Sequence, residues 1–295
     1  MVRIANVCAS ACISVCAALL AAAGAAVAQP APSAPRAPTS PEAVVQFVDN
    51  FVTPTHTTGK IARWEEGICP LTVGQQPAVT KFVTDRVKQI AALVGAPVNA
   101  SPTCTPNIEI VFSRVPQDLL DNIHGHQPDY LGYAESTADM QKLATMTKPI
   151  QAWYETQTVD LRGMARIDSA RPQENPNGVH VARSTGNHLT DGVRSTFAHI
   201  VIVAAVTKLT GYEAGPLADY ITMLALTQIN SLDTCQPLFS IENMLAKGCE
   251  TKNGKLTDND IAYLRGVYKM AGDKKLLANQ QNEIASVMQK VLDGP

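Results

Sequence analysis

The chain has 295 residues, of which 45% are hydrophobic and 17% charged, and its formal net charge at pH 7 is −2. A balance this close to neutrality, without any block of like charges, argues against nucleic acid or an anionic membrane surface as a partner. The length and the apolar content are sufficient for one domain with a full hydrophobic core.

The first segment has the features of a secretory signal peptide. Arg3 supplies a positive charge, an Ala-rich apolar stretch covers Val7–Val27, and Ala26-Val27-Ala28 is a small-x-small cleavage site. We therefore expect residues 1–28 to be removed. A transmembrane anchor is the alternative interpretation, but the Ala-rich composition and the cleavage site favour the signal peptide. We expect an exported protein, periplasmic or extracellular, with no membrane span after signal cleavage.

Residues 29–39 are rich in proline and alanine, which predicts a flexible leader, and residues 40–295 are expected to form a single domain. Ser40 can cap a helix that begins at Pro41 and carries an apolar stripe as far as Val52. Pro77–Val94 is the clearest amphipathic helix of the N-terminal half. Its predicted buried face consists of Val79, Phe82, Val83, Val87, Ile90, Ala91 and Val94. Shorter elements are expected over Lys60–Glu65, Asn107–Ser113 and Pro149–Val159 (strands) and Pro116–Ile123 (helix).

The C-terminal half is expected to contain the centre of the fold. A long polar surface excursion is predicted over Arg162–Asn187. His199–Val206 is an unbroken apolar run rich in β-branched residues, which is typical of a strand covered on both faces. The helix over Leu217–Ile229, with Pro216 at its first position, is so apolar that it should be a core helix. Three further helices are expected: Ile241–Ala246, one capped by Thr257 with Asp260, and Lys274–Leu292. The order predicts an α+β domain with one central mixed sheet packed by helices.

Four cysteines remain after the expected cleavage, and an even number in an oxidising compartment predicts disulfides. Of three possible connectivities, we favour the most local one, which pairs Cys69 with Cys104 and Cys235 with Cys249. In the chain-entropy model these bonds would stabilise the fold by about 4 and about 3 kcal/mol. A zinc site made of all four cysteines is the alternative, but the chain contains no CxxC pair.

Two segments resemble secreted zincin-like proteins. Leu256–Tyr268 is similar to the LT-x-x-D-x-x-x-L-x-x-LY helix that follows the active-site helix in such proteins. Leu217–Met223 is similar to the LADY-x-x-M helix of an uncharacterised family of secreted bacterial proteins. The order of a strand, a long helix, strands and a buried helix also resembles the layout of metallopeptidase domains of the zincin type. This resemblance implies a zincin-like arrangement with C-terminal helices.

The chain lacks the catalytic feature of that layout. A zincin places the HExxH motif on the active-site helix, where two histidines hold Zn²⁺ and the glutamate serves as base. Leu217–Ile229 contains neither His nor Glu, so we expect no metal, no cofactor and no metallopeptidase activity. The leading interpretation is a non-catalytic domain that binds an unknown protein or a small ligand in the corresponding cleft. Asp219 and Tyr220 are the candidate binding residues, although Asp219 also fits a role in complementing the helix dipole.

The alternative function is a hydrolase with a non-standard His/Asp site near residues 180–199. The residues that could contribute are His180, Ser184, His188, Asp191, Ser195 and His199. No G-x-S-x-G motif accompanies them, so convergence of these side chains in one pocket would be needed to support this hypothesis. The H-x-H pair His124 and His126 is expected to lie in a solvated turn rather than to bind a metal.

Overall fold

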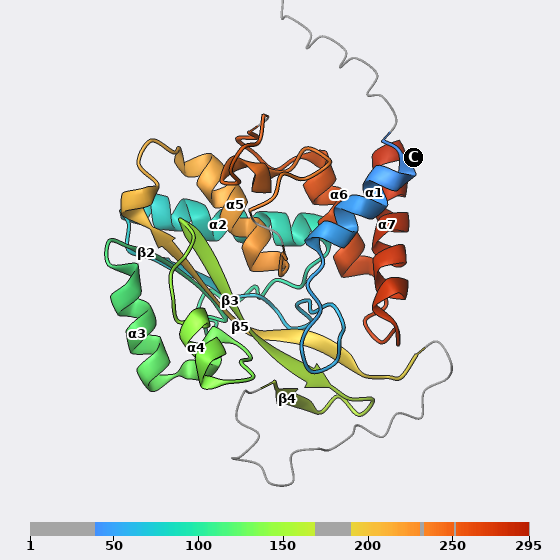
Figure 1. Ribbon diagram of the computed structural model, residues 1–295, viewed down its shortest axis with the longest axis horizontal. Helices are drawn as coiled ribbons and strands as arrows, with labels where there is room; N and C mark the ends of the chain where they lie inside the picture. The colour runs from blue at the N-terminus through green and yellow to red at the C-terminus, as the bar shows by residue number, and fades with distance from the viewer. Residues whose placement is uncertain (1–38, 169–189, 231–232, 251, 295) are drawn as a thin grey trace, which may run out of the picture. The chain divides into compact units, whose positions relative to one another are not determined.

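The computed structural model describes residues 39–168, 190–230, 233–250 and 252–294 (Figure 1). The expected signal peptide, residues 1–28, lies outside these ranges, as do most of the leader and most of the polar excursion. None of the helices in the described ranges combines the length and the apolar composition that a membrane span requires. The helices are α1 (Pro41–Phe51), α2 (Pro77–Val94), α3 (Pro116–His126), α4 (Thr137–Leu143), α5 (Ala214–Leu226), α6 (Asp258–Lys269) and α7 (Leu277–Asp293), with 3-10 turns η1 (Pro128–Leu131), η3 (Val206–Lys208) and η4 (Ile241–Met244). The strands are β1 (Pro70–Val73), β2 (Ile108–Ser113), β3 (Ile150–Val159), β4 (Ala165–Ile167) and β5 (Arg194–Ala205).

One five-stranded mixed sheet forms the centre of the domain, in the order β1-β2-β5-β3-β4. β1, β2 and β5 are parallel, β3 is antiparallel to β5, and β4 is antiparallel to β3. β5 therefore has a strand on each side, and its residues are buried along nearly its whole length. This confirms the expected α+β domain with a central mixed sheet, and it explains the unbroken apolar run in β5.

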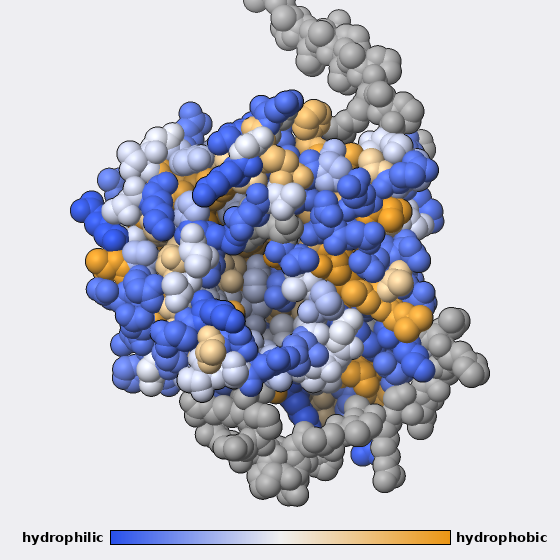
Figure 2. Space-filling model, in the orientation of Figure 1, coloured by the Kyte–Doolittle hydropathy of each residue, from blue (hydrophilic) through white to orange (hydrophobic). Residues whose placement is uncertain are grey.

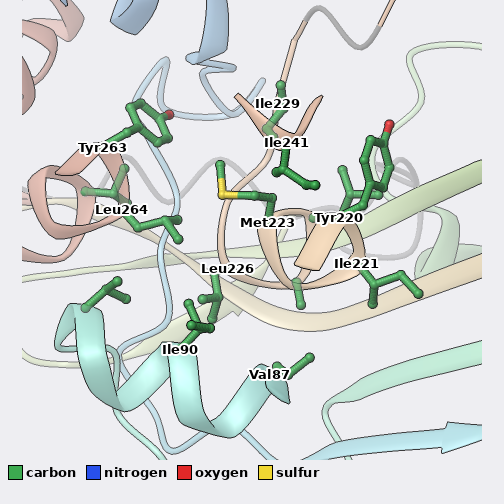
Figure 3. Close-up of a cluster of buried hydrophobic side chains, with 14 of the residues drawn as sticks. Val87, Ile90, Tyr220, Ile221, Met223, Leu226, Ile229, Ile241, Tyr263 and Leu264 are labelled. Atoms are coloured by element: carbon green, nitrogen blue, oxygen red, sulfur yellow. The ribbon is translucent and has the colours of Figure 1, made fainter. Parts of the chain in front are cut away.

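Helices α2 and α5 cover one face of the sheet and carry the main core. Every residue from Leu217 to Leu226 is buried. Figure 3 shows Val87 and Ile90 of α2 beneath the side chains of α5, with Tyr263 and Leu264 of α6 to the left of that helix. The helix predicted to be a core helix is therefore one, and α6 and α7 extend the same core as C-terminal helices.

The opposite face of the sheet is covered by α3, η1 and α4. A smaller cluster there joins Leu120 of α3, Leu131 of η1 and Trp153 of β3 to Val201 and Val203 of β5. The indole N–H of Trp153 donates to the carbonyl of Leu143 at 2.7 Å, which fixes the end of α4 against the sheet. The sheet is thus enclosed by helices on both faces, as Figure 1 shows.

An extra residue in β5 changes which side chains face each layer. Glu155 lies opposite His199 and Thr156 lies opposite Phe197, so Ala198 has no counterpart on β3. A bulge of this kind reverses the alternation of side chains along the bulged strand. Phe197 consequently packs in the main core, whereas Val201 packs in the smaller cluster.

Both expected disulfides are present. Cys69 is bonded to Cys104, 35 residues later, and Cys235 is bonded to Cys249, 14 residues later. The first bond joins the residue before β1 to the segment that leads into β2, and the second encloses η4. The local connectivity predicted from the sequence is therefore correct.

The limits of α5 differ from those predicted. The helix begins at Ala214 rather than at Pro216, since a proline is tolerated anywhere in a first turn that needs no backbone donor. It ends at Leu226, and Ile229 forms a single antiparallel bridge with Val52 instead of continuing the helix. The chain after α5 is thereby tied to the end of α1.

Several short elements were predicted incorrectly. Lys60–Glu65 is not a strand, because it pairs only at single residues, Ile61 with Pro54 and Arg63 with Thr196. The strand β1 was missed because its pattern is reversed: Thr72 is buried while the apolar Leu71 and Val73 are exposed. The short α4 and β4 were not predicted either.

Two predictions about side-chain positions on helices also fail. Phe82 was assigned to the buried face of α2, but it is 46% exposed because it lies beside, not within, the stripe that faces α5. His124 and His126 lie in the last turn of α3 rather than in a loop. Residues two apart on a helix point to different sides, so this H-x-H pair cannot share a metal ion.

Candidate functional site

A cavity of about 340 Å³ lies beside strand β3. Its walls come from segments far apart in the sequence: residues 54–56, residues 131–133, β3 from Gln151 to Thr156, and residues 228–230. Figure 2 shows a hollow near the centre of the visible face, above β3 and the end of α5, with polar and apolar side chains around it. The size suits one side chain or a small molecule, and the mixed lining is typical of ligand sites.

The cavity lies at the outer edge of β3, because residues from both faces of that strand line it. Ala205 N donates to Pro149 O, so the odd-numbered residues of β3 bond to β5 and the even-numbered residues point away. Asp168 N donates to Thr156 O on that outer side, in agreement with this alternation. The N–H and C=O of Ala152 therefore point outward, and within the described residues neither has a hydrogen-bond partner.

Gly132 allows the chain after η1 to approach this edge. Its φ is 88° and its ψ is −169°, a combination that residues other than glycine rarely adopt. A Cβ atom on Gly132 would lie 2.7 Å from the carbonyl oxygen of Tyr154. The contact closes the strand edge at Tyr154 and leaves it open at Ala152, which defines one end of the cavity.

Lys148 lines the cavity from a turn that is held by hydrogen bonds. The side-chain oxygen of Gln151 accepts hydrogen bonds from the backbone N–H groups of Thr147 at 2.9 Å and of Lys148 at 3.3 Å. The ammonium group of Lys148 contacts a carboxylate oxygen of Asp233 at 2.5 Å. The lysine side chain is 25% exposed, whereas Asp233 is 83% exposed, so the cation is the fixed member of the pair.

His56 and Tyr133 form the opposite rim. Their rings are stacked with centroids 4.1 Å apart and an interplanar angle of 13°. The Nε2 atom of His56 lies 2.5 Å from a carboxylate oxygen of Glu135, which fixes the orientation of the imidazole. Together they provide a flat aromatic surface with one polar group.

Beneath the cavity lies a buried polar cluster. The hydroxyl of Tyr154 donates to the carbonyls of Leu224 at 3.0 Å and Thr227 at 3.2 Å. Below it, the carboxyl group of Glu242 is buried, and neither of its oxygens has a hydrogen bond of ordinary geometry. Burial, reinforced by the neighbouring Asp260, raises the pKa of Glu242 well above its usual value.

The two binding residues predicted from the sequence do not line this cavity. Asp219 accepts hydrogen bonds from Nε of Arg86 at 2.5 Å and from the backbone N–H of Leu256 at 2.9 Å, so both of its oxygens hold the fold together. Tyr220 is 1% exposed and lies near Glu242 within the core. Burial, followed by the effect of Glu242, raises the pKa of Tyr220 well above its usual value. Their predicted binding role stays a prediction.

The described members of the alternative hydrolase site do not converge. Ser195 lies before the bulge of β5 and bonds to the hydroxyls of Thr55 and Thr58, whereas His199 follows the bulge and faces the other side of the sheet. His199 stacks on Tyr130, with centroids 4.2 Å apart. Burial lowers its pKa more than nearby Glu109 raises it. Asp191 is paired with Lys60 instead. His180, Ser184 and His188 lie outside the described residues.

The part of the chain that the structure describes contains no group of side chains suited to bind a metal ion. Within it, no three His, Cys, Asp or Glu side chains are grouped so as to hold a metal ion. The expectation that the protein binds no zinc stays a prediction.

No protein-family model, curated protein or solved structure matches this chain. Sequence reasoning placed Trp153 and Tyr154 on a strand but did not find the cavity, because its walls come together only in the folded chain. The one local signal was the Gly132-Tyr133 pair, where a glycine adjoins an aromatic residue in an otherwise unassigned segment.

Proposed function

We propose that this protein is an exported, non-catalytic domain of zincin-like arrangement that binds an extended segment of a partner protein in the cavity beside β3. Support for export comes from the features of residues 1–28 and from the two disulfides. Support for the zincin-like arrangement comes from the antiparallel strand β3 next to β5, and from a buried helix α5 that follows β5. The helix carries no HExxH motif, which favours binding over catalysis.

The observation that carries the proposal is the open backbone of Ala152 inside a cavity of mixed lining. An extended chain laid along this edge can accept a hydrogen bond from the Ala152 N–H and donate one to its C=O. One of its side chains can then enter the cavity between the His56–Tyr133 rim and Lys148. Backbone pairing supplies affinity and the cavity supplies specificity, without any reacting group.

The substitution Ala152→Pro tests this arrangement. Proline removes the outward N–H but no bond of the β3–β5 ladder, so the fold should persist. Ala152→Ser, which keeps the N–H, is the matched control. Pooled synthetic hexapeptides of random sequence with free carboxyl termini are passed over each immobilised protein, and retained peptides are identified by mass spectrometry.

We expect the unaltered protein and Ala152→Ser to retain the same set of peptides. The affinity of Ala152→Pro for these peptides should be lower by about tenfold or more, because one hydrogen bond is lost and the proline ring blocks the strand edge. Circular dichroism and intact disulfides must show that the proline variant is folded. Retention of no peptide by the unaltered protein, or equal retention by a folded proline variant, would overturn the proposal.

A further inference from the structure

The side chains that line the cavity include basic groups but no acidic ones. Among them, Lys148 and His56 carry basic groups, and none is an aspartate or a glutamate. The two basic groups differ in exposure: the side chain of His56 is 50% exposed, whereas that of Lys148 is 25% exposed. Lys148 is therefore the less exposed of the two basic groups in the cavity lining.

The present partner of Lys148 is poorly suited to neutralise it permanently. Asp233 is 83% exposed, and an ion pair with such a carboxylate is worth little because water solvates it almost as well. A carboxylate that arrives with a ligand and is held in place by other contacts can replace it at small cost.

The buried carboxyl group of Glu242 accepts no hydrogen bond from this cation, although the charge of Lys148 acts to lower the pKa of that carboxyl group. It lies in the core, where burial outweighs this effect and raises its pKa well above its usual value. The turn that carries Lys148 is held by hydrogen bonds to the side chain of Gln151, which fix the backbone from which the ammonium group extends.

We infer that Lys148 binds a carboxylate group of the segment that occupies the cavity, so that the ligands of this protein are peptides that carry a carboxylate into the cavity beside Ala152. The inference rests on the proposed function, because it assumes a peptide beside β3. Either a free carboxyl terminus or an acidic side chain supplies the required group.

The test uses the same random hexapeptides as two pools, one with free carboxyl termini and one with amidated termini. Each pool is applied to the unaltered protein, to Lys148→Gln, to the charge-preserving control Lys148→Arg, and to Asp233→Asn. Retained sequences show whether the terminus or an acidic side chain is selected.

We expect Lys148→Gln to lose about tenfold in affinity for the retained peptides, Lys148→Arg to keep most of it, and Asp233→Asn to gain several-fold because the competing carboxylate is gone. Preference for free termini identifies the main-chain carboxylate, and enrichment of Asp or Glu in the amidated pool identifies a side chain; both support the inference. One outcome would overturn this inference and leave the proposed function intact. In it, Ala152→Pro no longer retains the peptides, Lys148→Gln retains them as well as the unaltered protein does, and the retained peptides show no preference for a carboxylate. Retention of no peptide overturns both.

Discussion

Arg86 in the middle of α2 donates a hydrogen bond to Asp219 in the first half of α5, with 2.5 Å between Nε and the carboxylate oxygen. The second oxygen of Asp219 accepts from the backbone N–H of Leu256, just before α6. One carboxylate, 4% exposed, therefore joins three parts of the main core. Its position next to Tyr220 in the sequence suggested a binding role, but its contacts are those of a structural anchor.

Substitution of Asp219 separates the two roles. Asp219→Ala leaves the Leu256 N–H without its acceptor and Arg86 without its counter-ion, which should lower the free energy of unfolding by roughly 2–3 kcal/mol. Urea denaturation followed by circular dichroism measures this loss. At urea concentrations where the variant is folded, peptide retention by the cavity should be unchanged. A loss of peptide retention with unaltered stability would instead support a binding role for Asp219.

Glu242 should make stability depend on pH. Its pKa is raised in the folded protein, mainly by burial, so the unfolded chain releases this proton at lower pH than the folded chain does. The folded state then binds more protons, and the contribution of Glu242 to stability falls as pH rises above the usual pKa of a glutamate, about 4.3.

Glu242→Gln keeps the shape of the side chain and cannot ionise. We expect this variant to be more stable than the unaltered protein at pH 8, and the difference to shrink towards pH 4. Thermal unfolding across this pH range measures the effect, with the exposed Glu250→Gln as control. A pH profile identical to that of the unaltered protein would contradict the raised pKa of Glu242 in the folded state.

The two disulfides should differ in what they contribute. Their sequence separations are 35 and 14 residues, for which the chain-entropy model gives about 4 kcal/mol for Cys69–Cys104 and about 3 kcal/mol for Cys235–Cys249. Double substitutions to serine, one pair at a time, should lower the midpoint of urea unfolding in that order. A larger loss for the Cys235–Cys249 pair would mean that η4, with Glu242, depends on its covalent closure.

Gly132 tests the construction of the cavity. Gly132→Ala combines a backbone conformation reserved for glycine with a Cβ atom 2.7 Å from Tyr154 O, and should cost about 2 kcal/mol of stability. Gly125→Ala is the matched control, since it lies within α3 and a Cβ there meets nothing within 4 Å. That variant should gain about 0.5–1 kcal/mol. Equal effects on unfolding would contradict the close approach of Gly132 to β3.

The sequence alone determined the parts of this protein that depend on local patterns. The amphipathic pattern of Pro77–Val94 predicts a helix whatever it packs against, and α2 has these bounds. Thr257 and Asp260 form the predicted capping box, because its bonds join residues three apart. The unbroken apolar run of β5 likewise indicated burial on both faces, and the even set of cysteines indicated the local disulfides.

The tertiary structure decided everything that depends on which segments meet. The bulge at Ala198 sends Ser195 and His199 to opposite faces, and regular alternation would have predicted the same face. The open edge at Ala152 exists because β4 pairs only with the far end of β3. The walls of the cavity come from four segments that are distant in the sequence, so no local sequence pattern could predict it. Local sequence sets backbone preference and burial, whereas a site is a relation between distant residues that only the packed chain establishes.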